Sequence, residues 1–133
     1  MIQHSPENVI GVGIDIVENT RIRGALSCWG ERFRNRIFTG LEQAYCDAKV
    51  QPCLHYGVRF ACKEAFIKAL GESRPSNLRW LDMEIVSGKK GSPWMRLHSD
   101  QIPLKDDQIR ISLSHTKNYS VAVVLITKKE TSG

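Results

Sequence analysis

The chain lacks the features that would place it in a membrane or on a secretory route. Its 133 residues contain no run approaching the roughly 18 consecutive apolar residues that a membrane span needs. The N-terminal stretch has no basic start followed by an apolar run and a small-residue cleavage site, so it does not read as a signal peptide. These absences predict a cytoplasmic protein that is not a membrane protein.

Cysteine is scarce and poorly spaced for metal binding. The four cysteines are Cys28, Cys46, Cys53 and Cys62, with no Cys-x-x-Cys pair and no histidine at zinc-finger spacing. This pattern argues against a structural zinc site and predicts reduced, mostly packed thiols.

Nucleotide-binding glycine motifs are also missing. The "GVG" at residues 11–13 lacks the third glycine of a dinucleotide fingerprint. The "GKKGS" at residues 88–92 has neither the spacing nor the following helix of a phosphate-binding P-loop. Neither stretch predicts a nucleotide site.

What the chain does contain is an ordinary globular composition with an excess of positive charge. Hydrophobic residues make up 41% and charged residues 25%, and 19 Lys and Arg against 14 Asp and Glu give a net charge of +5. The length predicts one domain over residues 1–133, with 1–8 and 127–133 as flexible tails. The positive charge favours an anionic partner, which could be a nucleic acid, an acidic protein or a phosphorylated small molecule.

The order of predicted elements indicates an α+β fold with a mainly antiparallel sheet packed against a long central helix. Apolar runs and periodicity predict a buried strand, then helices interrupted near two glycines, and finally two hairpins. The predicted elements are the strand Val9–Val17, helix over 20–45 broken near Gly30 and Thr39-Gly40 with a capping box at Thr39 and Glu42, a loop with Pro52, the helix Arg59–Leu70 ended by Gly71, and hairpins over 81–98 and 109–126.

The central helix carries two charges on an otherwise apolar circumference. A helical wheel places Glu64 and Lys68 side by side, one turn apart, on a helix that should be largely enclosed. One interpretation is a local ion pair on a solvent-facing edge, worth a few tenths of a kcal/mol. The other is that an enclosed carboxylate has a chemical use, because burying it is costly.

A second acid, Asp15, lies inside the apolar strand "GVGIDIV". It could be held by backbone hydrogen bonds alone. Alternatively, Asp15 and Glu64 meet where strand and helix cross and bind Mg²⁺, which prefers a couple of carboxylates with substrate phosphate oxygens and water. Lys68 would then direct its charge to a phosphate as well as to Glu64. This second hypothesis explains both acids at once.

Two further groups of polar residues are candidates for binding. In "SLSHTK", adjacent strand residues point to opposite faces, so Ser114 and His115 are badly placed as a nucleophile and its base. His115 is either a surface-turn residue or a contact to a phosphate or ribose. The arginines of one helical region form either a solvated face or a docking surface; they are Arg21, Arg23, Arg32, Arg34 and Arg36.

Taken together, these stretches resemble the holo-acyl-carrier-protein synthase family of phosphopantetheinyl transferases. The matching segments are "GVGIDIVENTRI" at 11–22, "ERFRNRIFTGLE" at 31–42, "RFACKEAFIKALG" at 59–71 and "SLSHTKNYSVAVV" at 112–124. The resemblance covers most of the chain, and the first and third segments are the most specific to the family.

The resemblance implies transfer of 4'-phosphopantetheine from coenzyme A to a serine of apo-acyl carrier protein, with release of adenosine 3',5'-bisphosphate. It makes Asp15 and Glu64 ligands of Mg²⁺, with Lys68 and Lys63 near the phosphates. It also assigns residues to the rest of coenzyme A: Gly71 lines the pocket, and Arg59, His115 and Thr116 contact the nucleotide end.

The resemblance further implies a homotrimer with coenzyme A between subunits, and contact of Arg21 with the acidic carrier protein. Neither nucleic acid nor a membrane is then expected as a partner. Two departures stand out: Cys62 replaces a usual alanine, and "GESRPSNL" after the helix lacks a second glycine soon after Gly71. The first should be tolerated, and the second affects the coenzyme A pocket.

Two other functions remain open from the residues alone. A basic module that binds nucleic acid would account for the charge, but it leaves Asp15 and Glu64 unexplained. A phosphoryl-transfer enzyme with another pyrophosphate substrate would use the same acids. Consumption of coenzyme A distinguishes the predicted transferase from both.

Overall fold

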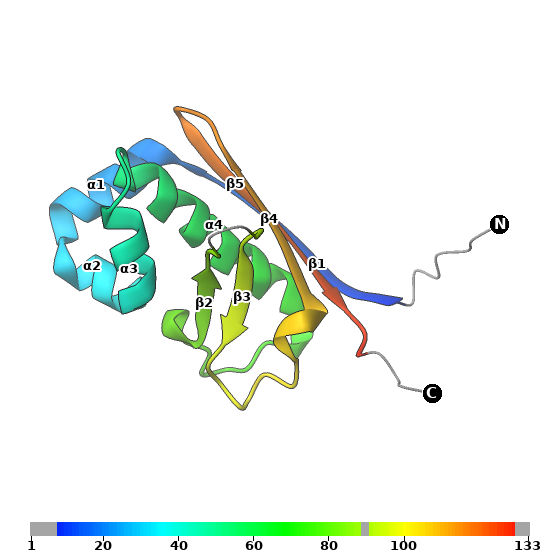
Figure 1. The fold of residues 1–133 in the computed structure, drawn as a ribbon. Helices are drawn as coiled ribbons and strands as arrows, with labels where there is room; N and C mark the ends of the chain where they lie inside the picture. Colours follow the sequence, from blue (N-terminus) through cyan, green and yellow to red (C-terminus); the bar gives the residue numbers. More distant parts are fainter. Residues whose placement is uncertain (1–7, 89–90, 130–133) are drawn as a thin grey trace.

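The computed structural model describes residues 8–88 and 91–129, and its elements follow the predicted order (Figure 1). The strands are β1 (Val9–Glu18), β2 (Met83–Val86), β3 (Trp94–Leu97), β4 (Ile109–His115) and β5 (Tyr119–Thr127). The helices are α1 (Asn19–Trp29), α2 (Glu31–Ile37), α3 (Gly40–Asp47) and α4 (Pro52–Leu70), with short 3₁₀ turns at Gly71–Ser73, Trp80–Asp82 and Asp106–Gln108. The predicted α+β class with antiparallel strands is confirmed.

The strands form two antiparallel sheets on α4. One sheet has the order β1-β5-β4, and the hairpin β2-β3 forms the other. Register in the first sheet places Asp15 opposite Ala122 and His115 opposite Ser120. Helix α4 runs along β1 and β5, while α1, α2 and α3 gather at one end (Figure 1).

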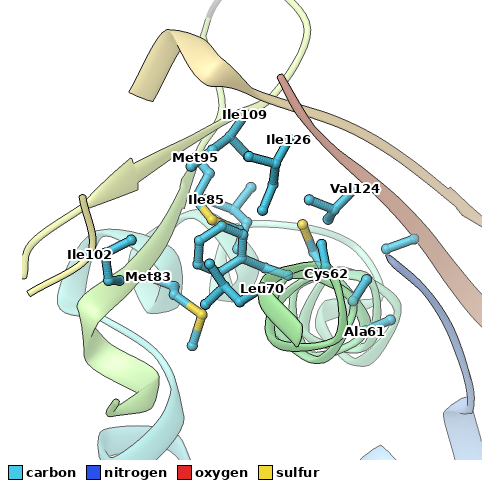
Figure 2. Packing of buried hydrophobic residues seen from close by; sticks show 14 residues of the cluster. Ala61, Cys62, Leu70, Met83, Ile85, Met95, Ile102, Ile109, Val124 and Ile126 are labelled. Carbon is cyan, nitrogen blue, oxygen red and sulfur yellow. The ribbon is translucent and has the colours of Figure 1, made fainter. Parts of the chain in front are cut away.

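The core lies between α4 and the two sheets. Figure 2 shows Met83, Ile85 and Met95 of the hairpin meeting Val124 and Ile126 of β5 around the apolar face of α4. Cys62, the predicted tolerated departure, lies in this core with no exposed surface. Burial raises the pKa of its thiol to about 12, so Cys62 stays protonated and packs as an apolar residue.

Several boundaries differ from those predicted. Helix α4 begins at Pro52, which was expected in a loop; proline is well suited to the first helical turn, where its missing N–H has no intrahelical partner. Of the predicted tails, residues 1–7 and 130–133 lie outside the described residues. Asn8, expected in the first tail, accepts a hydrogen bond from the Lys128 backbone, and Thr127 belongs to β5. Residues 89–90, inside the predicted hairpin over 81–98, also lie outside the described part.

The prediction of a buried first strand is wrong for the single chain. Side chains alternate between two faces, and only one face of the sheet meets α4. Val12, Ile14 and Ile16 point the other way, with exposures of 59%, 61% and 62%. The sheet therefore presents an apolar face that residues 8–88 and 91–129 do not cover.

Candidate functional site

The site begins with an unusually close contact between β1 and α4. Gly11 and Gly13 face the helix, and a Cβ at Gly13 would lie 1.8 Å from the carbonyl oxygen of Ala65. Because residues two apart on a strand share a face, the contact that brings Gly13 onto α4 also turns Asp15 toward the helix. The two glycines thus bring the carboxylate of β1 next to the charged stripe of α4.

Asp15 is bound by Lys68 rather than by backbone donors. The Lys68 Nζ donates to Asp15 Oδ1 at 2.8 Å and to the carbonyl of Ile14 at 3.2 Å. The Asp15 side chain is 14% exposed, whereas that of Lys68 is 54% exposed. The hydrogen bond and the charge of Asp15 raise the pKa of Lys68, so the ammonium stays protonated. The alternative of a local pair between Glu64 and Lys68 is wrong, because the lysine pairs across to the strand.

Glu64 lies beside this pair without a hydrogen bond or ion pair of its own among the described residues. Burial, followed by the charge of Asp15, raises the pKa of Glu64. The effect of the Asp15 charge on Glu64 indicates that the two carboxylates lie near each other, and a metal site shared between them stays a prediction. Within residues 8–88 and 91–129, no cluster of three acidic, histidine or cysteine side chains forms a closed metal cage.

Two carboxylates, with no third acidic, histidine or cysteine ligand in the part of the chain that the structure describes, suit one class of metal. Mg²⁺ is usually held by one or two carboxylates and completes its shell with water and substrate phosphate oxygens. Zinc, in contrast, usually takes three or four nitrogen or sulfur ligands from the protein. The donor set of Asp15 and Glu64 therefore fits Mg²⁺.

The position of Lys63 corrects the sequence expectation. Its ammonium is fully buried and bonds Glu42 Oε1 at 2.7 Å, the Ile37 carbonyl and the Trp80 carbonyl at 3.3 Å. These acceptors use its three N–H donors, so none is left for a phosphate. Lys63 thus joins α4 to the end of α2, the start of α3 and the Trp80–Asp82 turn, on a different side of the helix from Lys68.

Arg59 is buried in a pocket of about 190 Å³ on the same helix. It is 2% exposed, donates to Ser87 Oγ at 2.7 Å and to the His55 carbonyl at 3.1 Å, and stacks 4.3 Å from the Tyr45 ring centre. Its Nε is buried without a hydrogen-bond partner among the described residues. No carboxylate pairs with it there, which leaves a buried cation for an anion to bind.

His115 and Thr116 lie where β4 turns into β5, beside a larger hollow of about 700 Å³. Arg23 and Lys117 also line this hollow, so its polar surface is basic. His115 borders the Arg59 pocket as well, which makes the two spaces neighbours.

The residue that holds this turn is Asn19, which the sequence reasoning missed. Asn19 is 1% exposed, and its side-chain amide donates to the carbonyls of Thr116 and Lys117 at 3.1 Å each. Its oxygen accepts from Ser120 Oγ at 2.6 Å. The sequence signal for this role was weak: it shows an asparagine at the start of a helix, and the hydrogen-bond partners of that asparagine lie about a hundred residues later in the chain.

Gly71 ends α4 and opens the loop that departs from the family pattern. Its φ of +55° lies in the region that favours glycine, and open space surrounds it. The 3₁₀ turn Gly71–Ser73 follows directly, closed by a hydrogen bond from Ser73 Oγ to the Leu70 carbonyl. Gly71 thus stands at an exposed corner at the end of α4.

The arginine cluster divides over two helices. Arg21 and Arg23 are exposed on α1, whereas Arg34 of α2 pairs with Asp47 at 3.5 Å. Arg32 and Arg36 flank an apolar hollow of about 710 Å³ whose other walls are Trp29, Phe33, Ile37, Phe60 and Trp80. Phe60 and Trp80 stack with ring centres 5.4 Å apart. An aromatic groove with basic edges therefore lies at the α1–α2 end of the molecule.

This geometry agrees with what comparison to known proteins finds. The family model of the 4'-phosphopantetheinyl transferase superfamily matches residues 11–124, which include the two carboxylates, Lys68 and the His115 turn. The chain belongs to this superfamily. The resemblance to holo-acyl-carrier-protein synthases predicted from the sequence is confirmed by relatives of that name.

The relatives match over nearly their whole length. The holo-[acyl-carrier-protein] synthase of Chloroherpeton thalassium is 44% identical over 115 residues, covering 86% of this chain and 95% of the relative. That of Protochlamydia amoebophila is 40% identical, covering 85% and 93%. The crystal structure of the Helicobacter pylori synthase in complex with coenzyme A has a TM-score of 0.76 at 28% identity, covering 87% and 99%.

No helix in the described parts of the chain combines the length and apolar character that crossing a bilayer requires. The cytoplasmic location stays a prediction.

Proposed function

We propose that this phosphopantetheinyl transferase moves 4'-phosphopantetheine from coenzyme A to a serine of apo-acyl carrier protein, with Mg²⁺. The products would be holo-acyl carrier protein and adenosine 3',5'-bisphosphate. The observation that carries the proposal is that Asp15 and Glu64, from two different elements, lie near each other and beside Lys68. Two findings support the choice of substrates. The relatives are named holo-[acyl-carrier-protein] synthases, and the Helicobacter pylori synthase was crystallised in complex with coenzyme A.

Asp15 and Glu64 are the residues that would hold the metal. Mg²⁺ at this position would neutralise charge that builds on the diphosphate oxygens and on the leaving group. Lys68, more than half exposed and already beside Asp15, can turn its ammonium to a phosphate oxygen when Asp15 gains another cation. The two acids, through the metal, and the lysine directly would then bind the same diphosphate.

The chemical step is an in-line displacement at the β-phosphorus. The carrier serine oxygen forms the new P–O bond, and the bond to the 5'-phosphate of the nucleotide breaks, leaving adenosine 3',5'-bisphosphate. The serine proton has to be accepted as attack proceeds. Glu64, which lies beside Asp15 and Lys68, is one group that would accept it.

The nucleotide end of coenzyme A would occupy the basic spaces beside the β4–β5 turn. The unpaired Arg59 guanidinium offers a buried anion contact, and His115 and Thr116 line the neighbouring hollow. Gly71, at the exposed end of α4, would line the far part of the coenzyme pocket. Lys63 has no place among these contacts because its donors are already used.

Carrier docking would take place at the α1–α2 end. The family resemblance predicts an acidic carrier protein, and the exposed Arg21 provides a complementary charge. The aromatic groove between Arg32 and Arg36 could receive an apolar side chain of the carrier. Charge would then steer the carrier, and the groove would anchor it.

A homotrimer would explain the uncovered sheet face. Val12, Ile14 and Ile16 form an exposed apolar row on β1, joined by Leu125 on β5, which is a common mark of an interface. Association through this face would restore the burial that the sequence of β1 predicts.

The test is transfer to apo-acyl carrier protein, followed by mass measurement of the carrier. Asp15→Asn and Glu64→Gln should each lower turnover by ~100-fold or more, the size expected when a fixed charge is lost from the transition state. Asp100→Asn, an exposed acid on a distant turn, should not. Mn²⁺ binding followed by electron paramagnetic resonance should weaken in the first two variants only.

Three outcomes would count against the proposal. Near-normal activity of either site variant would exclude its carboxylate from the metal site. Absence of transfer by the wild type in the presence of coenzyme A and Mg²⁺ would reject the function. Salt-sensitive binding to RNA or DNA in place of transfer would instead support a nucleic-acid module.

A further inference from the structure

Asn19 lies buried where the end of β1, the start of α1 and the turn between β4 and β5 meet. Both hydrogens of its side-chain amide bind turn carbonyls, those of Thr116 and Lys117, at 3.1 Å each. Its backbone N–H donates to the carbonyl of Asn118 at 2.8 Å. Three consecutive carbonyls of the turn therefore accept hydrogen bonds from this single residue.

Ser120 and Gly57 fix the other end of the asparagine side chain. Ser120 Oγ, which is fully buried, donates to Asn19 Oδ1 at 2.6 Å. Helix α4 comes so close that a Cβ on Gly57 would lie 2.6 Å from Ser120 Oγ and 3.0 Å from Asn19 Oδ1. Rotation of the amide by half a turn would place its oxygen against two carbonyl oxygens, so one orientation of the side chain is strongly favoured.

The conformation of the turn also determines what Thr116 can offer a ligand. Thr116 Oγ1 accepts hydrogen bonds from the backbone N–H groups of Asn118 and Tyr119, at 3.3 and 3.1 Å. A hydroxyl oxygen has two acceptor lone pairs and one hydrogen. With both lone pairs used in this way, the exposed Thr116 turns a donor to the ligand, which suits a phosphate or ribose oxygen.

An exposed turn that is held in place before the ligand arrives binds more tightly than one that the ligand has to order. Ordering a mobile segment on binding loses conformational entropy, and this loss subtracts from the affinity. The three hydrogen bonds from Asn19 remove that cost for the two residues that line the basic hollow, His115 and Thr116.

We propose that Asn19 is a positioning residue for the nucleotide end of coenzyme A, because it holds the β4–β5 turn in the conformation in which His115 and Thr116 bind. The inference rests on the proposed function, which places the nucleotide beside this turn. Asn19 is buried and acts through the turn. The candidate metal ligands Asp15 and Glu64 lie on β1 and α4 instead, so Asn19 should govern coenzyme affinity much more than the rate of the chemical step.

The experiment compares the wild type with Asn19→Asp, which keeps the size of the side chain but removes both amide donors. Because two hydrogen bonds to the turn are lost, KM for coenzyme A should rise by ~10-fold or more, with turnover at saturating coenzyme A within about twofold of the wild type. Inhibition by adenosine 3',5'-bisphosphate, which contains only the nucleotide end, should weaken by the same factor. Mn²⁺ binding, followed by electron paramagnetic resonance, should not change.

Two further variants complete the test. Ser120→Ala removes the donor that orients the asparagine amide and leaves both bonds to the turn, so it should weaken bisphosphate inhibition in the same direction by a smaller factor. The matched control is Asn35→Ala, which removes an exposed asparagine of α2 whose Oδ1 accepts from Gln43 at 3.1 Å. This control should behave as the wild type in all four measurements.

Unchanged bisphosphate inhibition in folded Asn19→Asp would overturn the inference, while the proposed transferase function would stand. A fall in turnover at saturation without a change in KM would overturn it as well. If Asn19→Asp does not fold, Ser120→Ala decides, because its small change in a buried side chain keeps the turn bonds, and wild-type inhibition in that variant would count against the inference. Failure of the wild type to bind coenzyme A would overturn both the inference and the proposed function.

Discussion

Replacing Gly13 by alanine tests whether the close packing of β1 on α4 builds the site. The new Cβ would lie 1.8 Å from the Ala65 carbonyl oxygen and 2.9 Å from the Ala69 backbone nitrogen. An ordinary carbon–oxygen contact is about 3.3 Å, so the strand has to move away from the helix by about 1.5 Å. Both contacts are to backbone atoms of a helix, which cannot turn aside as a flexible side chain would.

This displacement should affect both the fold and the chemistry. Overpacking of a tight interior contact costs about 1–3 kcal/mol, and we expect the upper end here because backbone has to shift. Asp15 would move with the strand, away from Glu64, and a misplacement of about 1 Å can cost ~100-fold in rate. Turnover should therefore fall further than the loss of folded protein can explain.

Urea unfolding and initial transfer rates at low temperature, where the variant stays folded, measure the two effects separately. The matched control is Gly24→Ala on the exposed face of α1, where an added Cβ meets nothing within 4 Å. That substitution should raise the unfolding free energy by about 0.5–1 kcal/mol, because alanine is the better helix former. A Gly13→Ala protein with the stability and turnover of the wild type would refute the reasoning.

Three other predictions address single features of the molecule. Because the native pKa of Glu64 is raised, its ionisation destabilises the fold as pH increases through the interval between the unfolded and native pKa values. Glu64→Gln should thus unfold at a higher urea concentration than the wild type at pH 7.5, and the difference should be gone below pH ~4. Equal urea midpoints at pH 7.5 would contradict this prediction. Lys63→Met should lower the unfolding free energy by about 3–5 kcal/mol, because it leaves Glu42 buried and unpaired. Adding Glu42→Gln should recover part of that free energy. Normal stability together with lost turnover would instead support a role of Lys63 in binding the phosphates. Ile14→Lys should convert the proposed trimer into monomers, which analytical ultracentrifugation would detect. A wild-type protein that sediments as a monomer would contradict the proposed interface.

Much of the fold could be predicted because local chemistry and tertiary packing agree along most of the chain. Gly30 and the capping box at Thr39 separate the three short helices where the pattern placed the breaks. The two hairpins follow from alternation and turn residues. The beginning of α4 could not be found this way, because polar and small residues after Pro52 weaken the apolar periodicity although the proline itself suits a first helical turn.

The sequence singles out Asp15 and Glu64 because both carry charge where the surrounding residues are apolar. Such a residue needs a partner or a function, and two in one chain favour a shared cause. Which cation Asp15 binds was beyond the sequence. A helical wheel describes only neighbours on one helix, so it pairs Lys68 with Glu64 and cannot include the strand that lies across from them.

Lys63 was grouped with Lys68 by the family resemblance alone, and the structure separates the two lysines. Lys68 is four residues from Glu64 and shares its side of α4, whereas Lys63 precedes Glu64 by one residue and is rotated by about 100°. That rotation turns Lys63 away from β1 toward α3, where Glu42 provides a buried counter-charge. A cation one residue from a candidate metal ligand can thus have a structural role, and it is the position of Glu42, 21 residues earlier in the chain, that decides this.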